Sequence, residues 1–446
     1  MWRKPIVWIP SLLVLLVVAG VIVLSSSRDA EAGVTELKAP HTLVWKDFLG
    51  VNAQFHFYPS DVQDLQMKAV KELNLEWVRI AMHWALLEPK QGQFNLTAFD
   101  GAAQSMHKYG LKPVGFLAGS APFASSAPAG AQFNDQYPPK SPALYINSLL
   151  TLIGRYPDFK VWQVWNEPNI YPYWRPKEDA AGYGRLLFAT YDAIKAKYPD
   201  KQVAIAGMAY FSQMPYTNNE LMLKLLLQQG IAKRDLIVAY HPYTEYPEGD
   251  DVKANDFLTR VQFINGALRT NGIKKIWATE WGWSSYEGPK DAQNIIGNDG
   301  QADYTLRRLA LMSALDFDRT FLFNLADLPY GAGTRDEKYG LLDVKGNRKP
   351  VFNALKNFFA VTGGTLQPQN PPRLTSTPND LYSIAWTRED GRHLWMFWSA
   401  SGQSLQMPDI PQATLYDPLK GSQTTLIALE GSLTVPVKTS LQMLVW

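Results

Sequence analysis

Two glutamates end strand-like runs and have tryptophans beside them, so both are candidates for acid–base or nucleophilic chemistry. The first lies in residues 161–169, VWQVWNEPN, where alternating apolar residues predict a strand that Pro168 ends. Glu167 would then lie at the carboxyl end of this strand, partly shielded from water by Trp165. Such burial raises the pKa of a carboxyl group and keeps it protonated, as a general acid requires. Asn166 is placed to hydrogen-bond a hydroxyl group of a substrate.

The second glutamate lies in residues 273–283, IKKIWATEWGW. The pattern again predicts a strand that ends in a carboxylate, Glu280, with Trp281 and Trp283 alongside. Gly282 between them permits an unusual backbone conformation at the turn. Either glutamate alone could be a capping or ion-paired residue, but two of them at strand ends indicate a shared site.

Paired carboxyl groups of this kind suit the cleavage of a glycosidic bond. One protonates the leaving oxygen while the other attacks the anomeric carbon or activates water. By the strand count below, Glu167 ends the fourth strand and Glu280 the seventh, and these ends face each other across a barrel mouth. We therefore expect Glu167 as general acid, and the family resemblance described below implies Glu167 as general acid/base and Glu280 as nucleophile, with their carboxyl groups about 5–5.5 Å apart.

Short apolar strands alternate with amphipathic helical stretches over most of the chain, which predicts an α/β fold with a parallel sheet. Eight units favour a closed (β/α)8 TIM barrel over residues 40–360, with its active site at the carboxyl ends of the strands. An open doubly wound sheet is the alternative, but no glycine-rich phosphate loop follows the first strand. The strand candidates are residues 48–52, 77–82, 112–117, 161–166, 202–207, 236–240, 275–280 and 320–324.

The pattern changes after the barrel. Gly363, Gly364 and residues 368–372, PQNPP, read as a linker. Short alternating segments follow, and they predict an all-β, sandwich-like domain over residues 361–446 that packs on the barrel. The segments are residues 381–387, 393–399, 413–416, 423–428, 432–437 and 440–446.

The first 30 residues predict a transmembrane anchor. Arg3 and Lys4 precede an apolar run over residues 6–24, close to the roughly 20 residues that a spanning helix needs. The basic flank should stay in the cytoplasm, so the inner membrane would hold the chain with its catalytic domain in the periplasm. The alternative is a signal segment cleaved near Ala30-Glu31-Ala32, which would leave a periplasmic or secreted protein.

Composition excludes several other classes of function. Without residues 1–30 the chain carries 40 basic and 40 acidic residues, which provides no electrostatic footprint for nucleic acid. There is no cysteine, and the six histidines form no HExxH or HxH pair, so we expect no metal. The chain has no phosphate-binding loop and no G-x-S-x-G elbow, and we expect no cofactor.

These motifs resemble the clan of retaining (β/α)8 glycoside hydrolases, in which Asn-Glu-Pro follows the fourth strand and a second glutamate ends the seventh. Residues 84–94, WALLEPKQGQF, and 340–343, GLLD, with Lys349 and Pro350, are similar to glycoside hydrolase family 39. With the anchor and the β domain, the chain looks most like hydrolases encoded with exopolysaccharide assembly systems. The resemblance implies an endo-acting hydrolase of a secreted or capsular biofilm exopolysaccharide, with the assembly machinery as a partner.

The resemblance also implies roles for further residues. Arg79 on the second strand matches the arginine that holds the nucleophile ionised. His241 and Tyr243, after the sixth strand, match a segment that contacts the nucleophile and the substrate. A buried ion pair or a structural histidine is the plainer interpretation of each. The aromatic residues that could carry sugar rings are Trp84, Tyr171, Tyr173, Trp174 and Trp283.

One segment departs from the clan pattern. Many clan members have a tryptophan at the end of the eighth strand, below the reactive sugar, and residues 321–327, FLFNLAD, contain none. The identity of the sugar is therefore open.

Two other functions remain as alternatives. A transglycosylase would keep the same glutamate pair but prefer a sugar to water as the acceptor. A non-catalytic, membrane-tethered polysaccharide-binding assembly protein would be expected to have lost one of the glutamates, and both are present.

Overall fold

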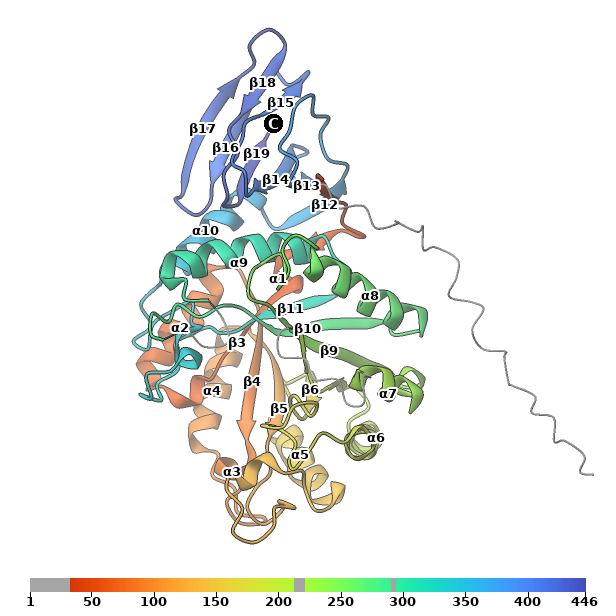
Figure 1. Cartoon of the computed structure of the whole chain (residues 1–446). Helices are drawn as coiled ribbons and strands as arrows, with labels where there is room; N and C mark the ends of the chain where they lie inside the picture. The colour runs from red at the N-terminus through yellow and green to blue at the C-terminus, as the bar shows by residue number, and fades with distance from the viewer. Residues whose placement is uncertain (1–32, 212–220, 290–293) are drawn as a thin grey trace, which may run out of the picture.

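The computed structural model describes residues 33–211, 221–289 and 294–446. Its larger part is a closed barrel of eight parallel strands (Figure 1). The predicted eight-stranded barrel is therefore confirmed, and every strand overlaps its predicted range. The strands are β3 (Leu49–Asn52), β4 (Trp77–His83), β5 (Lys112–Ala118), β6 (Val161–Val164), β7 (Gln202–Ile205), β9 (Leu236–Tyr243), β10 (Lys275–Trp281) and β11 (Arg319–Leu322).

The barrel closes because β10 pairs with both β9 and β11, while β11 pairs with β3. A short strand, β8 (Met208–Phe211), follows β7 and pairs in parallel with the last residues of β9. All eight carboxyl ends thus meet at one mouth, where side chains from distant parts of the chain come together.

Helices cover the outside of the barrel, and their starts follow simple capping chemistry. The Ser141 hydroxyl accepts a hydrogen bond from Ala143 N, and Asp179 accepts one from Gly182 N at the start of the next helix. The longer helices are α2 (Ser60–Glu72), α4 (Thr97–Lys108), α5 (Pro142–Arg155), α6 (Ala180–Lys197), α7 (Met222–Gln228), α8 (Asp256–Thr270), α9 (Gly297–Ser313) and α10 (Pro350–Thr362). Two single turns, α1 (Trp45–Phe48) and α3 (Trp84–Leu87), complete the set of α-helices in the described ranges.

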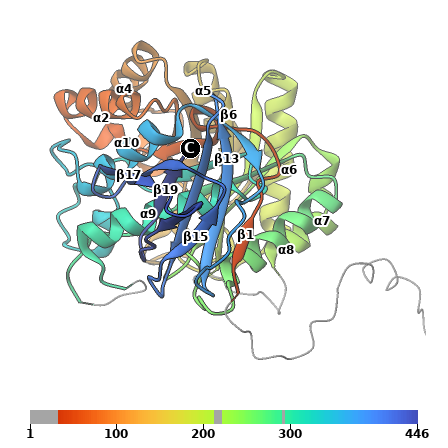
Figure 2. The ribbon, with the colours of Figure 1, turned by 90° about the horizontal axis from the view of Figure 1, so that it is seen from above.

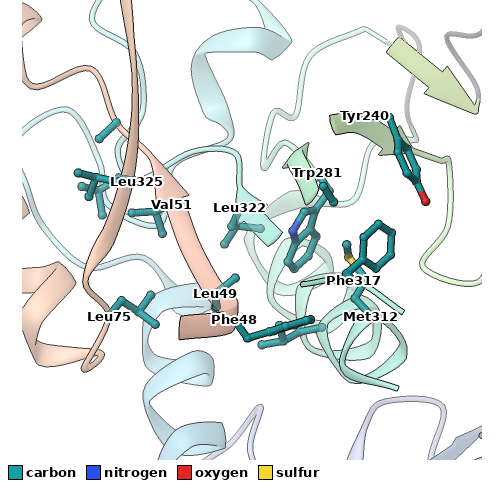
Figure 3. Close-up of a cluster of buried hydrophobic side chains, with 14 of the residues drawn as sticks. Phe48, Leu49, Val51, Leu75, Tyr240, Trp281, Met312, Phe317, Leu322 and Leu325 are labelled. Carbon is teal, nitrogen blue, oxygen red and sulfur yellow. The ribbon is translucent and has the colours of Figure 1, made fainter. Parts of the chain in front are cut away.

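Side chains fill the barrel on both sides of its sheet. Figure 3 shows part of the outer layer, a buried apolar cluster that includes Val51 and Leu322 from strands together with Met312 and Phe317. Inside the barrel, Phe321 needs the space left by Gly50, because a Cβ atom there would lie 2.6 Å from its ring. The interior cluster comprises Val114, Val161, Ala204, Ile237, Ala239, Trp277 and Phe321.

A β module follows the barrel and lies across α9 and α10 (Figures 1 and 2). Its main sheet has eight strands, and a two-stranded sheet, β15 (Leu405–Pro408) with β18 (Ser432–Val435), covers the face that points away from the barrel. Strand alternation explains this arrangement, since Tyr382, Ile384 and Trp386 face the barrel core while Leu381 and Ala385 face the small sheet. The main strands are β12 (Thr365–Gln369), β13 (Leu381–Arg388), β14 (His393–Ser399), β16 (Gln412–Asp417), β17 (Ser422–Ile427) and β19 (Gln442–Val445).

Two strands of this main sheet come from the start of the described chain. β1 (Thr35–Leu37) pairs with β13, and β2 (Leu43–Val44) pairs with β12. Part of the expected linker is also strand, because Pro368 lies in β12 opposite Trp386. These strands have two to five residues, too few to show an alternating pattern.

The predicted membrane anchor, residues 1–30, lies outside the described residues. Within the described ranges, no helix has the length and apolar character that crossing a membrane requires.

Candidate active site

Glu167 and Glu280 lie at the barrel mouth, on the ends of β6 and β10. β6 stops at Val164, and the chain then turns sharply, with Trp165 at φ +71° and Glu167 at φ +42°. The left-handed region is costly for residues with a side chain, so this turn is a strained segment held by its surroundings. One such contact is the hydrogen bond from Glu167 N to Gly207 O, at 3.1 Å.

Arg79, on β4, fixes the carboxylate of Glu280. Its Nη1 lies 2.6 Å from Glu280 Oε1, and the arginine side chain is fully buried. The other N–H groups of the guanidinium are also used, since Arg79 donates to the side-chain oxygens of Asn52 at 2.7 Å, Gln163 at 2.9 Å and Asn166 at 2.8 Å. A guanidinium held at this many points cannot swing away from Glu280.

His241 and Tyr243, at the end of β9, connect the two glutamates. His241 Nδ1 lies 2.7 Å from Glu167 Oε1 and 3.7 Å from Glu280 Oε2. Tyr243 donates its hydroxyl hydrogen to Glu280 Oε2 at 3.3 Å. His241 Nε2 lies 3.0 Å from the hydroxyl of Thr279, so both ring nitrogens have partners.

The buried imidazole of His241 depends on a glycine. A Cβ atom at Gly207 would lie 1.9 Å from His241 Nε2 and 2.6 Å from the Thr279 hydroxyl. The close approach of the chain between β7 and β8 to the ring therefore requires glycine at this position.

The two carboxyl groups are near neighbours. Glu167, His241 and Glu280 each place a ligand-type atom within 4.8 Å of the other two. Within the described ranges this is the one cluster of this kind that could hold a metal ion. Arg79 already supplies a positive charge at Glu280, so the cluster suits proton transfer and nucleophilic attack better than it suits a cation.

The environment separates the two glutamates in acidity. Burial raises the pKa of Glu167 above its ordinary value, and the nearby charge of Glu280 adds to the rise against an opposing contribution from His241. Burial alone would also raise the pKa of Glu280, but the charges of His241 and Arg79, with hydrogen bonds from Arg79 and Tyr243, bring it below its ordinary value. Glu167 is thus the better proton donor, and Glu280 is the better nucleophile.

A cavity of about 220 Å³ opens beside Glu280. Arg79, Asn166 and Glu280 form its polar wall, and Tyr173 and Phe323 contribute aromatic surface. This volume suits a single sugar ring better than a chain, so a longer substrate would have to extend over the rim.

Three of the predicted sugar platforms are wrong. Trp84, Trp174 and Trp283 are at most 4% exposed and pack inside the protein. Trp84 donates its indole hydrogen to Glu88 at 2.7 Å, and Trp283 donates to the carbonyls of Thr244 and Glu245 at 3.1 Å each. Tryptophan next to a strand end can be core or platform, and the sequence pattern is the same in both cases.

The two predicted tyrosines lie at the surface. Tyr173 lines the cavity, whereas Tyr171 is exposed outside it. Phe323, which follows β11, lines the cavity. The segment without tryptophan thus still contributes an aromatic ring to the cavity wall.

Several residues of the site carried no signal of their own in the sequence. Asn52, Gln163 and Thr279 position Arg79 or His241 through hydrogen bonds, and Gln54 and His83 line the cavity. Their place at or near strand ends was the available signal, because Asn52 and His83 end β3 and β4.

Comparison with known proteins supports the same class. The family described as beta-galactosidase, glycoside hydrolase 42, matches residues 54–130, which include Arg79 but neither glutamate. No curated protein matches the whole sequence or a part of it.

Solved structures share the fold at low sequence identity. A family 39 glycoside hydrolase from Bacteroides cellulosilyticus WH2 has a TM-score of 0.66 at 18% identity, covering 89% of this chain and 80% of its own. A beta-xylosidase from Caulobacter crescentus CB15 has a TM-score of 0.60 at 17% identity, covering 93% of this chain and 99% of its own. A family 30 endoxylanase from Clostridium papyrosolvens C71 has a TM-score of 0.59 at 12% identity, covering 92% of this chain and 98% of its own. The resemblance to (β/α)8 glycoside hydrolases predicted from the motifs is thereby confirmed, with family 39 among the matches.

Proposed function

We propose that the protein is a retaining glycoside hydrolase that cleaves within polysaccharide chains. The observation that carries this proposal is the pair Glu167 and Glu280, whose ligand-type oxygens lie within 4.8 Å and whose pKa values are shifted in opposite directions. Carboxyl groups about 5–5.5 Å apart leave no room for a water molecule between nucleophile and sugar, whereas inverting enzymes need about 6.5–9.5 Å.

The geometry supports a reaction in two steps. Glu280 attacks the anomeric carbon, the bond to the leaving oxygen breaks, and Glu167 gives that oxygen its proton. Esterification removes the charge of Glu280, so the pKa of Glu167 falls and the ionised Glu167 can accept a proton from water. Water then attacks the anomeric carbon, Glu280 leaves, and the configuration at that carbon is retained.

The test is the stereochemistry of the first product. The protein is incubated with a panel of aryl glycosides and polysaccharides, and the new anomeric signal is followed by proton NMR before it mutarotates. A product with the anomeric configuration of the substrate is expected. An inverted first product would contradict the mechanism, and no turnover of any panel member would contradict the activity.

We further propose that the substrate is an exopolysaccharide and that the inner membrane tethers the enzyme in the periplasm. The apolar run over residues 6–24 with Arg3 and Lys4 before it supports the tether, and the resemblance to hydrolases encoded with exopolysaccharide assembly systems supports the substrate. Full-length protein should fractionate with the inner membrane, and a version starting at Gly33 should be soluble. Recovery of mature protein that begins near Gly33 from cells expressing the full chain would show cleavage instead.

A further inference from the structure

Two large aromatic rings outside the cavity are exposed at the barrel mouth. Phe133, in the loop after β5, is 57% exposed, and Tyr171, in the loop after β6, is 52% exposed. Neither ring lines the cavity beside Glu280. Exposed aromatic rings that sit together at the rim of a site mark a binding surface more often than isolated ones do.

Arg175 holds these two rings in one unit. Its guanidinium carbon lies 4.1 Å from the ring centre of Tyr171 and 5.2 Å from that of Phe133. Arg175 Nη1 donates to the Tyr171 hydroxyl at 2.6 Å, and Nε donates to Gln136 Oε1 at 2.6 Å. The unit is ordered before any ligand arrives, which lowers the entropic cost of binding.

The backbone at Phe133 is strained. Phe133 has φ +55°, a left-handed conformation that is uncommon for a bulky residue. Such strain persists where surrounding contacts hold it, and it is concentrated at ligand sites. Here the hydrogen bond from Arg175 N to Gln136 O, at 2.9 Å, joins the two loops directly beside the strained residue.

This unit is continuous with the catalytic cavity. Gln136, which anchors Arg175, lines the cavity, and so does Tyr173, two residues after Tyr171. A chain that leaves the cavity over this wall therefore meets Tyr171, Arg175 and Phe133 next.

We propose that Phe133, Arg175 and Tyr171, here called the rim ledge, form an accessory subsite for a sugar residue of a polysaccharide beyond the ring held in the cavity. The aromatic faces match the apolar face of a pyranose, and the guanidinium supplies N–H donors for its hydroxyl groups. The inference rests on the proposed function and deepens it, because an enzyme that cuts within a chain needs contacts on sugars away from the scissile bond.

The first arm of the test measures binding to whole polymers. Wild-type protein and the Tyr171→Ala, Phe133→Ala and Arg175→Lys variants migrate through native gels that contain xylan, glucomannan or galactomannan. Arg175→Lys keeps the charge and loses the planar group that stacks on both rings. Retardation of the wild type by at least one polymer, weakened about five- to tenfold in each variant, is expected for aromatic and arginine anchors that the sugar covers when it binds.

The second arm compares substrate lengths. For the sugar that the wild type cleaves, kcat/KM on the hexasaccharide should fall about five- to tenfold more in each ledge variant than kcat/KM on the 4-nitrophenyl monoglycoside. Phe263→Ala is the matched control, because Phe263 is 72% exposed on α8 away from the mouth and should change neither value.

The outcomes separate the two proposals. Absence of gel retardation of the wild type, or equal retardation of wild type and ledge variants, would overturn the rim ledge. Equal losses on the hexasaccharide and the monoglycoside would overturn it as well, because they would mean that the loops support only the catalytic cavity. Wild-type retardation that depends on the ledge, without cleavage of any panel substrate, would leave the ledge standing and overturn the proposed hydrolase activity.

Discussion

Glu167 and Glu280 carry the same carboxyl group at two strand ends of one barrel mouth, but Glu280 lines the cavity and Glu167 does not, and their charged neighbours differ. Glu280 accepts a hydrogen bond from Arg79 Nη1 at 2.6 Å and another from the hydroxyl of Tyr243 at 3.3 Å. Glu167 has neither of these two partners, and His241 Nδ1 lies 2.7 Å from its Oε1. Both are buried, so burial raises the pKa of each and cannot distinguish them. The charges of His241 and Arg79, with the hydrogen bonds from Arg79 and Tyr243, hold the pKa of Glu280 down, and the charge of Glu280 in turn raises the pKa of Glu167.

The comparison is tested most strongly by removing the nucleophile. Glu280→Ala should lower kcat on every substrate by on the order of 10⁵-fold, because no other group can form the covalent intermediate. Steady-state rates on aryl glycosides and on polysaccharide measure the loss, and circular dichroism checks the fold. Residual turnover within tenfold of wild type would assign the nucleophile elsewhere.

Removing the acid should have an effect that depends on the leaving group. Glu167→Ala should lose about 10²–10⁴-fold on natural linkages, which need protonation. It should lose much less in the first step on dinitrophenyl glycosides, whose leaving group needs no proton. Added azide should restore the second step and give a glycosyl azide with retained configuration. Azide rescue of Glu280→Ala with an inverted product would reverse the two roles.

Weakening the guanidinium should move the acid limb of the pH profile most, because Arg79 acts on Glu280 through both charge and a hydrogen bond and on Glu167 through charge alone. Without the charge of Arg79, the pKa of Glu280 rises, so the acid limb of kcat/KM should move to higher pH, by about one unit or more in Arg79→Met. Arg79→Lys keeps a charge but loses the forked contacts, and its shift should be smaller. Both variants need a thermal melt as a control, since Arg79 also satisfies Asn52, Gln163 and Asn166. An unmoved acid limb in folded Arg79→Met would show that His241 alone keeps Glu280 ionised.

The smallest expected effect concerns Thr279. Thr279→Val removes the partner of His241 Nε2, so His241 is less firmly held against Glu167 and lowers its pKa less. The alkaline limb of kcat/KM should then move to higher pH by a few tenths of a unit, while Arg79 and Glu280, the other charged groups near Glu167, stay unchanged. Thr279→Ser keeps the hydroxyl and should keep the wild-type profile. A shift in Thr279→Ser as large as in Thr279→Val would attribute the effect to packing and not to the hydrogen bond.

The barrel and the two glutamates were predictable because local pattern and covalent spacing determine them. Each barrel strand is an apolar run of limited length, and a carboxylate after such a run must lie at the carboxyl end of the sheet. The expected partners Arg79, His241 and Tyr243 came from resemblance, and the contacts with the glutamates agree with it. The β segments of the C-terminal module followed from alternation, apart from β1, β2, β12 and β15.

What the sequence by itself determined was the order of the elements and the residue types at their ends, since these depend on neighbours along the chain. Only the tertiary structure decided which tryptophans are core, because Trp84, Trp174 and Trp283 have the same local pattern as a sugar platform. It also decided that the pKa values of Glu167 and Glu280 shift in opposite directions, because those shifts depend on contacts such as that of Arg79 from β4 with Glu280 from β10, 201 residues away. The pKa of a carboxyl group depends on its burial and on the charges of all groups close to it in space, and the order of residues along the chain does not record those distances.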